Sequence, residues 1–154
     1  MILKLKSLII SLAISLGVGG LSSVVTKGSS EIYKGLNQPP LAPPSWLFPI
    51  VWTILYILMG ISSYIIYESN SNIKNKALTV YITQLAVNFI WPILFFNLEM
   101  FLFSFIWLIL LLGLVLYMTL LFYQIKPFAA YLQIPYILWL IFAGYLNLMI
   151  YILN

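Results

Sequence analysis

Five apolar runs, each about as long as a bilayer is thick, constrain this chain more than any other feature. They cover residues of about 5–26, 46–67, 77–97, 100–122 and 129–152. A transmembrane helix needs roughly 20 predominantly apolar residues to cross the hydrocarbon core. We therefore predict an all-α integral membrane protein, a bundle of five transmembrane helices that forms a single domain over residues 1–154.

The composition excludes several classes of protein. Of the 154 residues, 64% are hydrophobic and only 6% are charged, whereas soluble domains carry about 25% charged residues. The chain has no Cys and no His, so disulfides, thiolate nucleophiles and the usual ligands of zinc, copper and iron are missing. We expect no metal site and no cofactor. The lysines are scattered among the loops, which argues against a nucleic-acid partner.

The charges also predict how the chain sits in a cell membrane. The N-terminal stretch MILKLKSLII resembles a signal peptide, but its apolar region is long and no A-x-A site follows, which favours a retained helix. Of the seven lysines, five fall on the side of the N-terminus and two on the other. This bias predicts a cytoplasmic N-terminus, an external first loop and an external C-terminus.

The middle of every span lacks ionisable residues. Ion pumps and proton-coupled transporters place such residues there, because moving charge requires a relay or a counter-charge. This absence argues against ion-coupled transport and against hydrolytic chemistry.

Three spans carry stripes of aromatic and amide side chains at the spacing of one helix face. The stripes are Phe48, Trp52, Tyr56 and Met59; Gln84, Asn88, Trp91 and Phe95; and Tyr136, Trp139, Ala143 and Asn147. Aromatic residues at this spacing often only pack, and an amide within a membrane often only joins helices. Pockets for small molecules, however, combine apolar walls with a few polar groups. The stripes therefore leave packing and a pocket for a flat, apolar ligand as alternatives.

Small residues recur in the first span. Ser11, Ser15, Gly19 and Ser23 follow one another every four residues. Such faces let helices approach closely, either within the bundle or across a dimer.

Three motifs resemble the translocator protein family (TspO/MBR), also called the tryptophan-rich sensory protein or peripheral-type benzodiazepine receptor family. They are PPLAPPSWLFPIVWTILY (39–56), QLAVNFIWPILFF (84–96) and PYILWLIFAGYLN (135–147). The resemblance covers nearly the whole chain. It implies a five-helix bundle, commonly homodimeric, that binds porphyrins, related tetrapyrroles and benzodiazepine-type drugs beneath the first loop.

The resemblance also implies which residues form the site. The key tryptophans of the family match Trp52 and Trp139. Further contributors would be Tyr33, Pro43, Pro44, Asn88, Trp91, Ala143 and Asn147. Two departures stand out: Ile32 precedes Tyr33 where many relatives have a Trp-Tyr pair, and no basic residue follows Lys126, so a cholesterol role is unsupported.

The proline-rich stretch suggests a lid over residues 27–45. Proline fixes φ and favours extended structure, so residues 38–44 should form a stiff strap that folds over the mouth of the bundle. A P-x-x-P motif (Pro40 to Pro43) is also a ligand of adaptor domains, a reading that an external loop disfavours.

Several functions remain open at this stage. The chain could be a sensor, carrier or scavenger of tetrapyrroles. It could instead degrade protoporphyrin IX under light, with Trp52 and Trp139 as the reactive indoles. Passive transport of hydrophobic molecules and a structural, partner-organising role are further alternatives.

Overall fold

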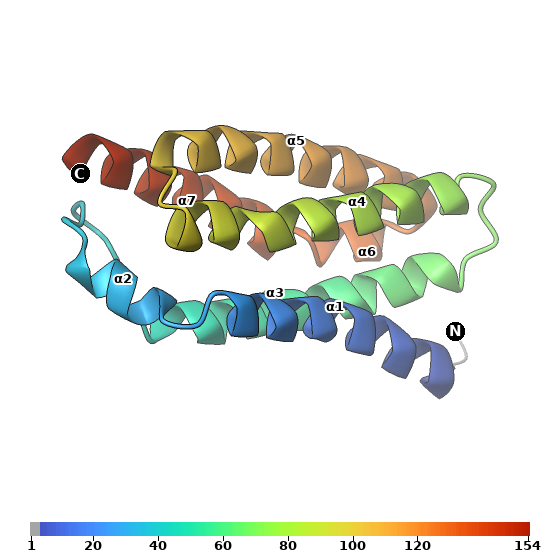
Figure 1. Ribbon diagram of the computed structural model, residues 1–154. Helices are drawn as coiled ribbons and strands as arrows, with labels where there is room; N and C mark the ends of the chain where they lie inside the picture. The colour runs from blue at the N-terminus through green and yellow to red at the C-terminus, as the bar shows by residue number, and fades with distance from the viewer. Residues whose placement is uncertain (1–3) are drawn as a thin grey trace.

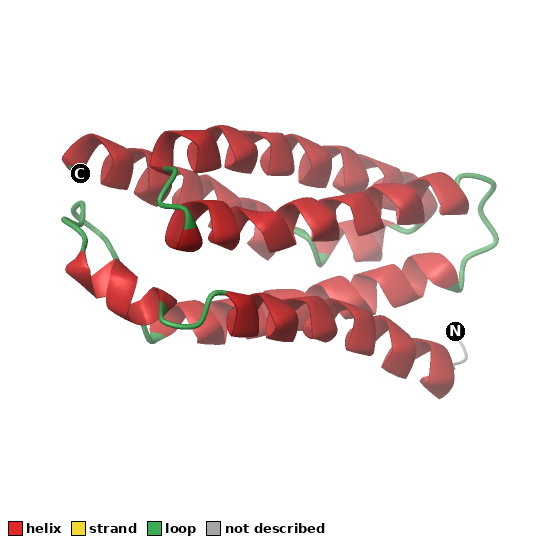
Figure 2. Ribbon diagram, viewed as in Figure 1, coloured by secondary structure: helices red, strands yellow, loops and turns green. Residues whose placement is uncertain are grey.

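The computed structural model describes residues 4–154, and all regular structure in that part of the chain is helical (Figures 1 and 2). The elements are α1 (Leu5–Val25), α2 (Ser29–Gly35), α3 (Leu47–Tyr67), α4 (Lys74–Pro92), the π-helix η1 (Ile93–Asn97), α5 (Phe101–Ile125), α6 (Pro127–Tyr131) and α7 (Ile134–Leu153).

Five helical segments are long and apolar enough to cross a membrane. They are Leu5–Val25, Leu47–Tyr67, Lys74–Asn97, Phe101–Ile125 and Pro127–Leu153. The predicted fold class, an all-α bundle of five transmembrane helices, is therefore confirmed. The fifth segment is divided into α6 and α7, and Pro135 occupies the first turn of α7, where its missing N–H leaves no helical bond unmade.

The bundle has one end that carries α2 and the C-terminus and an opposite end that carries the N-terminus (Figure 1). Along it, α1 lies against α3, α4 against α5, and α5 against α7. The half of the bundle away from α2 is closed by fully buried side chains such as Met59, Ile66, Val115, Met118 and Phe122.

Small residues allow α1 to approach α3 closely. A Cβ atom at Gly19 would lie 2.6 Å from Cδ2 of Tyr56, and one at Gly60 would lie 2.8 Å from the Ser15 hydroxyl. That hydroxyl donates a 2.7 Å hydrogen bond to the Tyr56 carbonyl oxygen. Ser15 and Gly19, two members of the predicted small-residue face, thus serve packing within the bundle.

Pro92 changes the helix in which it lies. A proline lacks the N–H that a helix interior needs, and α4 passes directly from Pro92 into the π-helix η1. The π-helical turn is widened, so that Leu98 N–H donates to the Ile93 carbonyl oxygen at 3.0 Å. Wide turns of this kind are frequent at functional sites.

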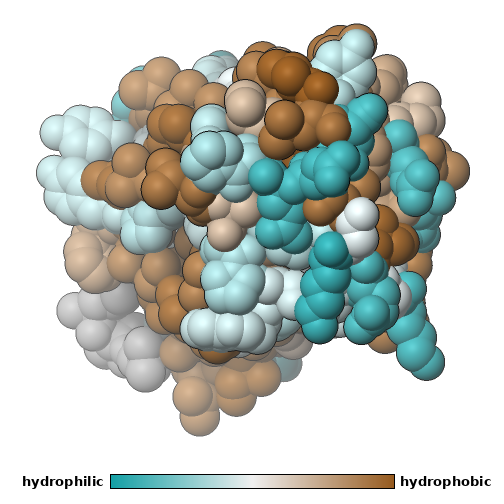
Figure 3. Space-filling view, turned by 90° about the vertical axis from the view of Figure 1, so that its left-hand side faces the viewer, coloured by the Kyte–Doolittle hydropathy of each residue, from teal (hydrophilic) through white to brown (hydrophobic). Residues whose placement is uncertain are grey.

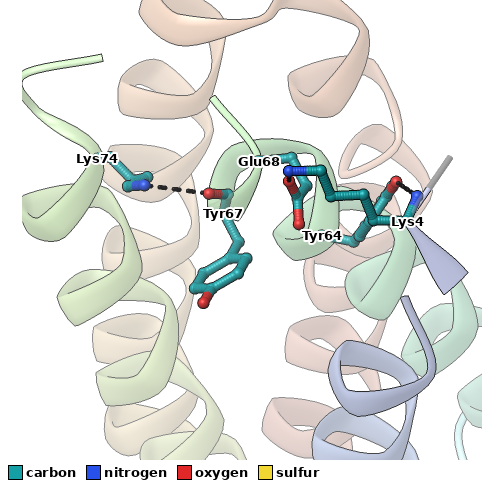
Figure 4. A network of polar contacts seen from close by, with 5 residues as sticks. All are labelled: Lys4, Tyr64, Tyr67, Glu68 and Lys74. Atoms are coloured by element: carbon teal, nitrogen blue, oxygen red, sulfur yellow. Dashed lines mark hydrogen bonds and ion pairs between the residues drawn. The ribbon is translucent and has the colours of Figure 1, made fainter. Parts of the chain in front are cut away.

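A polar network ties α1, α3 and α4 together at the N-terminal end (Figure 4). The Lys4 backbone N–H donates a 2.8 Å bond to the Tyr64 hydroxyl, and Lys4 Nζ lies 3.2 Å from Glu68 Oε2. Lys74 Nζ donates to the Tyr67 carbonyl oxygen at 3.1 Å. A hydrogen bond from Ser7 and the ammonium group of Lys4 lower the pKa of the Glu68 carboxyl group below its ordinary value of 4.5.

Candidate functional site: an aromatic cavity beneath the first loop

A cavity of about 480 Å³ lies at the α2 end of the bundle, between α1, α2, α3, α4, η1 and α7. Figure 3 looks onto this end of the molecule and shows hydrophilic side chains gathered over part of the face, with hydrophobic ones beside them. The volume falls within the range of about 300–1,000 Å³ that is usual for small-molecule pockets.

The walls from α3, α4, η1 and α7 are mainly aromatic. Their rings belong to Phe48, Trp52, Tyr56, Trp91, Phe95, Phe96 and Trp139. These rings contact one another: Phe48 and Trp139 meet edge to face with centroids 5.8 Å apart, and Trp91 stacks on Phe95 at 5.2 Å. Such walls can hold a flat, apolar molecule through its faces.

Ten of the residues expected in a pocket line this cavity. They are Tyr33, Phe48, Trp52, Tyr56, Asn88, Trp91, Phe95, Trp139, Ala143 and Asn147. The three stripes therefore converge from different helices on one space. Four others do not line it: Gln84 and Tyr136 lie one turn deeper and are fully buried, while Pro43 and Pro44 belong to the loop above.

A buried hydrogen-bond network forms the inner end of the cavity. Tyr56 Oη donates to Asn88 Oδ1 at 2.9 Å, and Asn88 Nδ2 donates to Tyr136 Oη at 2.6 Å. Tyr136 Oη in turn donates to Gln84 Oε1 at 2.7 Å. The network satisfies polar groups that would otherwise be costly in an apolar interior, and it joins α3, α4 and α7.

A second amide holds one of the cavity indoles. Asn147 Oδ1 accepts hydrogen bonds from Trp91 Nε1 at 3.0 Å and from the Ser104 hydroxyl at 3.1 Å. Asn147 Nδ2 donates to the Phe101 carbonyl oxygen at 2.8 Å. The orientation of the Trp91 ring is therefore set by the protein before any ligand arrives.

Trp139 differs from Trp91 in its hydrogen bonding. Its Nε1 is buried, and within residues 4–154 it has no hydrogen-bond partner. A buried donor without a partner costs about 1–3 kcal/mol. The indole lines the cavity, but its Nε1 is itself enclosed by the protein, so the ring offers the cavity its apolar surface.

The first loop is held by one hydrogen bond within itself and by another to α7. Tyr33 Oη donates to the Pro43 carbonyl oxygen at 2.7 Å, and Tyr145 Oη donates to that of Pro40 at 2.6 Å. Burial raises the pKa of the Tyr33 phenol above its ordinary value of 10.0, so this hydroxyl remains a donor at neutral pH. Pro43 and Pro44 thus contribute to the strap, and its role as a lid stays a prediction.

The contribution of α1 to the cavity was not foreseen from the sequence. Apart from Leu16, the lining residues from α1, from the turn that follows, from the first turn of α2 and from the loop before α3 are small or hydroxyl-bearing. They are Gly19, Gly20, Ser22, Ser23, Thr26, Ser29, Ser30 and Ser45. The only sequence signal was the small-residue repeat of the first span, which indicates close approach without saying to what.

Within the described residues 4–154, no group of three or more Asp and Glu side chains could hold a metal ion. The chemistry available in the cavity is therefore stacking, apolar contact and hydrogen bonding by indole, phenol, amide and hydroxyl groups.

Comparison with known proteins gives one consistent result. Residues 9–153 match the model of the TspO/MBR family. The chain is 35% identical over 153 residues to the tryptophan-rich protein TspO of Archaeoglobus fulgidus, covering 99% of both chains. It is also 35% identical over 140 residues to the translocator protein of Homo sapiens, covering 89% of this chain and 83% of the human one. The chain is thus an integral membrane protein that belongs to the TspO/MBR family.

Proposed function

We propose that this protein binds a porphyrin or a related tetrapyrrole in the aromatic cavity, and acts as a sensor, carrier or scavenger of that ligand. The observation that carries the proposal is the cavity itself, in which indole and phenyl rings from α3, α4, η1 and α7 surround about 480 Å³. A flat conjugated ring would stack on these side chains. Benzodiazepine-type drugs, which are also apolar and aromatic, would compete for the same space.

Trp139 Nε1 has no hydrogen-bond partner within residues 4–154, but it is buried, so the ligand would meet the apolar surface of this indole. The two amides of the cavity, by contrast, already have protein partners. Asn88 is hydrogen-bonded to Tyr56 and Tyr136, and Asn147 is hydrogen-bonded to Trp91. Their contribution would be to fix the walls of the cavity before binding, which lowers the entropic cost of association.

The closed half of the bundle favours binding over a continuous passage. Every residue that lines the cavity belongs to the α2 end, while Ile66, Val115 and Phe122 of the opposite half are fully buried. Five of the seven lysines lie at that opposite end. By the positive-inside rule the cavity would then face the external side of the cell membrane.

A fluorescence titration tests the proposal. The purified protein in detergent is titrated in the dark with protoporphyrin IX while tryptophan emission is followed. We expect saturable quenching, with at least about tenfold weaker affinity in Trp52→Leu and Trp139→Leu, because each removes a stacking surface of about 1–3 kcal/mol. The matched control is Trp46→Leu, since Trp46 is 65% exposed and does not line the cavity. Quenching that never saturates would overturn the proposal.

Light-dependent breakdown of protoporphyrin IX is a second candidate, favoured because the indoles of both Trp52 and Trp139 line the cavity. The illuminated ligand would be oxidised by dioxygen, whose atoms end in the product, while the protein orients the ring and presents oxidisable side chains. Illumination should then consume oxygen and produce a new absorbing species. Unchanged degradation rates in Trp52→Phe and Trp139→Phe variants that still bind would refute a redox role for these residues.

A further inference from the structure

The strap of residues 38–44 passes beside α7 at the outer end of the bundle. Just before it, Asn37 exchanges hydrogen bonds of 3.0 and 2.9 Å with Asn154. Within it, the Pro40 carbonyl oxygen accepts the 2.6 Å bond from Tyr145 Oη. Tyr145 lies about two helical turns, or about 12 Å, before the end of α7. Figure 1 shows this loop next to the C-terminal end of α7, so the strap lies at the flank of a membrane-spanning helix.

The backbone of the strap has few polar groups that need water. Four of its residues are prolines, which have no N–H to satisfy, and the carbonyl oxygens of all four accept hydrogen bonds within the protein. In chain order, those of Pro39, Pro40, Pro43 and Pro44 bond to the Ala42 N–H at 3.2 Å, to Tyr145 Oη, to Tyr33 Oη at 2.7 Å and to the Leu47 N–H at 3.1 Å. Because unsatisfied polar groups are what makes a loop costly in an apolar medium, this loop can leave water at a low cost.

Leu41 forms the tip of the strap. It is 81% exposed, the highest value among the large hydrophobic side chains of residues 4–154. Its φ of 71° is left-handed, a conformation that is uncommon for residues other than Gly. A glycine would form this turn with less strain. The leucine thus gives the turn an apolar tip at a cost to the backbone, and strain of this kind is typical of functional segments.

The sequence around the tip is uncharged. Lys34 is the last charged residue before the strap, and Glu68, beyond the end of α3, is the next. Trp46, which follows the strap and precedes α3, is 65% exposed. Tryptophan gathers at the level of the lipid headgroups, so its position indicates where the membrane surface crosses this end of the bundle. An uncharged loop with an exposed leucine at this level suits the boundary between headgroups and acyl chains.

We propose that the strap is a membrane anchor, which inserts the side chain of Leu41 among the upper acyl chains of the leaflet at the α2 end of the bundle. Lipid is the occupant of this surface because the strap lies along a helix whose exposed side chains face lipid. The first loop is then held in two ways, by α7 through Asn37 and Pro40, and by the bilayer through Leu41. The inference does not depend on what the cavity binds.

Single cysteines test the proposal, because the chain contains no Cys and an introduced thiol therefore has no background. Leu41→Cys is compared with two references, Glu31→Cys and Ile141→Cys, each labelled with a nitroxide and placed in phosphatidylcholine nanodiscs. Glu31 belongs to α2 at the same end and its side chain is 84% exposed, whereas Ile141 is exposed near the middle of α7. Power saturation measures the accessibility of each label to dioxygen, which concentrates in lipid, and to a water-soluble nickel chelate.

We expect the label at position 41 to resemble the one at position 141, with greater accessibility to dioxygen than to the nickel chelate. The label at position 31 should show the reverse. Access of the nickel chelate to position 41 equal to that at position 31 would place the tip in water and overturn the inference. Low accessibility to both reagents would also overturn it, because the tip would then contact protein and not lipid.

Because a nitroxide label is itself apolar, the unlabelled thiols provide an independent measurement. Thiolates are disfavoured in apolar surroundings, so we expect Leu41→Cys to react with a charged maleimide at least about tenfold more slowly than Glu31→Cys in the nanodisc. Each rate is divided by the rate of the same variant unfolded in SDS, which removes differences between the two sequence contexts. Equal normalised rates would overturn the inference even where the labelled protein supports it.

Discussion

Tyr56 Oη donates a 2.9 Å hydrogen bond to Asn88 Oδ1 and thereby joins α3 to α4 at the inner end of the cavity. Both residues are buried, and both line the cavity. The position of the Tyr56 ring also depends on α1, because Gly19 leaves the space that the ring occupies. One hydrogen bond thus connects the packing of three helices to the shape of the site.

Loss of the Asn88 side chain should destabilise the bundle. An Asn88→Ala variant leaves the hydroxyl of Tyr56 without an acceptor and that of Tyr136 without a donor. Hydrogen bonds between membrane helices contribute about 0.6–2 kcal/mol each, so we expect a loss of about 1–3 kcal/mol in the free energy of unfolding. Tyr56→Phe should cost less, because the bond to Tyr136 remains. Reversible unfolding in mixed micelles measures both, and a fully stable Asn88→Ala variant would contradict the role of this network.

A methyl group at position 19 should disturb the site by displacing the Tyr56 ring. The Cβ atom of Gly19→Ala would meet Cδ2 and Cε2 of Tyr56 at 2.6 and 2.7 Å. The ring is buried and hydrogen-bonded, so we expect it to move, and both stability and protoporphyrin affinity should fall. Gly17→Ala is the control, because a Cβ there meets nothing within 4 Å and Ala is the better helix former by about 1 kcal/mol. Equal behaviour of the two variants would show that the close approach is unimportant.

Release of the first loop should accelerate ligand exchange. Asn37 and Asn154 bond reciprocally: the backbone N–H of Asn37 donates to Asn154 Oδ1 at 3.0 Å, and Asn154 Nδ2 donates to the Asn37 carbonyl oxygen at 2.9 Å. Asn154→Ala removes both bonds, and we expect protoporphyrin to dissociate several-fold faster in stopped-flow measurements. Asn72→Ala, in the loop between α3 and α4, provides the control. Identical dissociation rates in all three proteins would argue against a lid.

The contact between Lys4 and Glu68 should make stability depend on pH. The pKa of Glu68 is lowered in the folded protein, so its contribution is present above the unfolded value of about 4.5 and is lost as the pH falls through the folded value. Wild type should therefore melt at a higher temperature than Glu68→Gln at pH 7, and the difference should shrink below about pH 4.5. A difference that is constant from pH 7 to pH 3 would assign the effect to packing instead.

The fold was predictable because its determinants are local. Each span can be recognised in the sequence by its length and hydropathy, and the stripes through Trp52, Trp91 and Trp139 follow from helical periodicity alone. Their convergence on one cavity required the structure, because periodicity gives the face of a helix but not its neighbour.

The rest of the site depends on tertiary contacts that no spacing encodes. Asn88 and Asn147 appear in the sequence as two free amides, yet the structure assigns both to protein partners, while the buried Nε1 of Trp139 has none within residues 4–154. The π-helical turn after Pro92 could not be predicted from the sequence either, since a proline predicts a bend in a helix without specifying its form. The contribution of α1 to the cavity wall emerges only when the neighbours of that helix are known.

Filling the cavity tests the central claim most directly. Ala143 is buried and lines the cavity, whereas Ala86 on α4 is exposed. Protoporphyrin IX affinity should be measured for wild type, Ala143→Phe and the control Ala86→Phe, after each has been shown to be folded by its melting curve. We predict that Ala143→Phe weakens binding at least about tenfold, the equivalent of about 1.4 kcal/mol, and that Ala86→Phe binds as the wild type does. A folded Ala143→Phe variant with wild-type affinity would contradict the claim that this cavity holds the ligand.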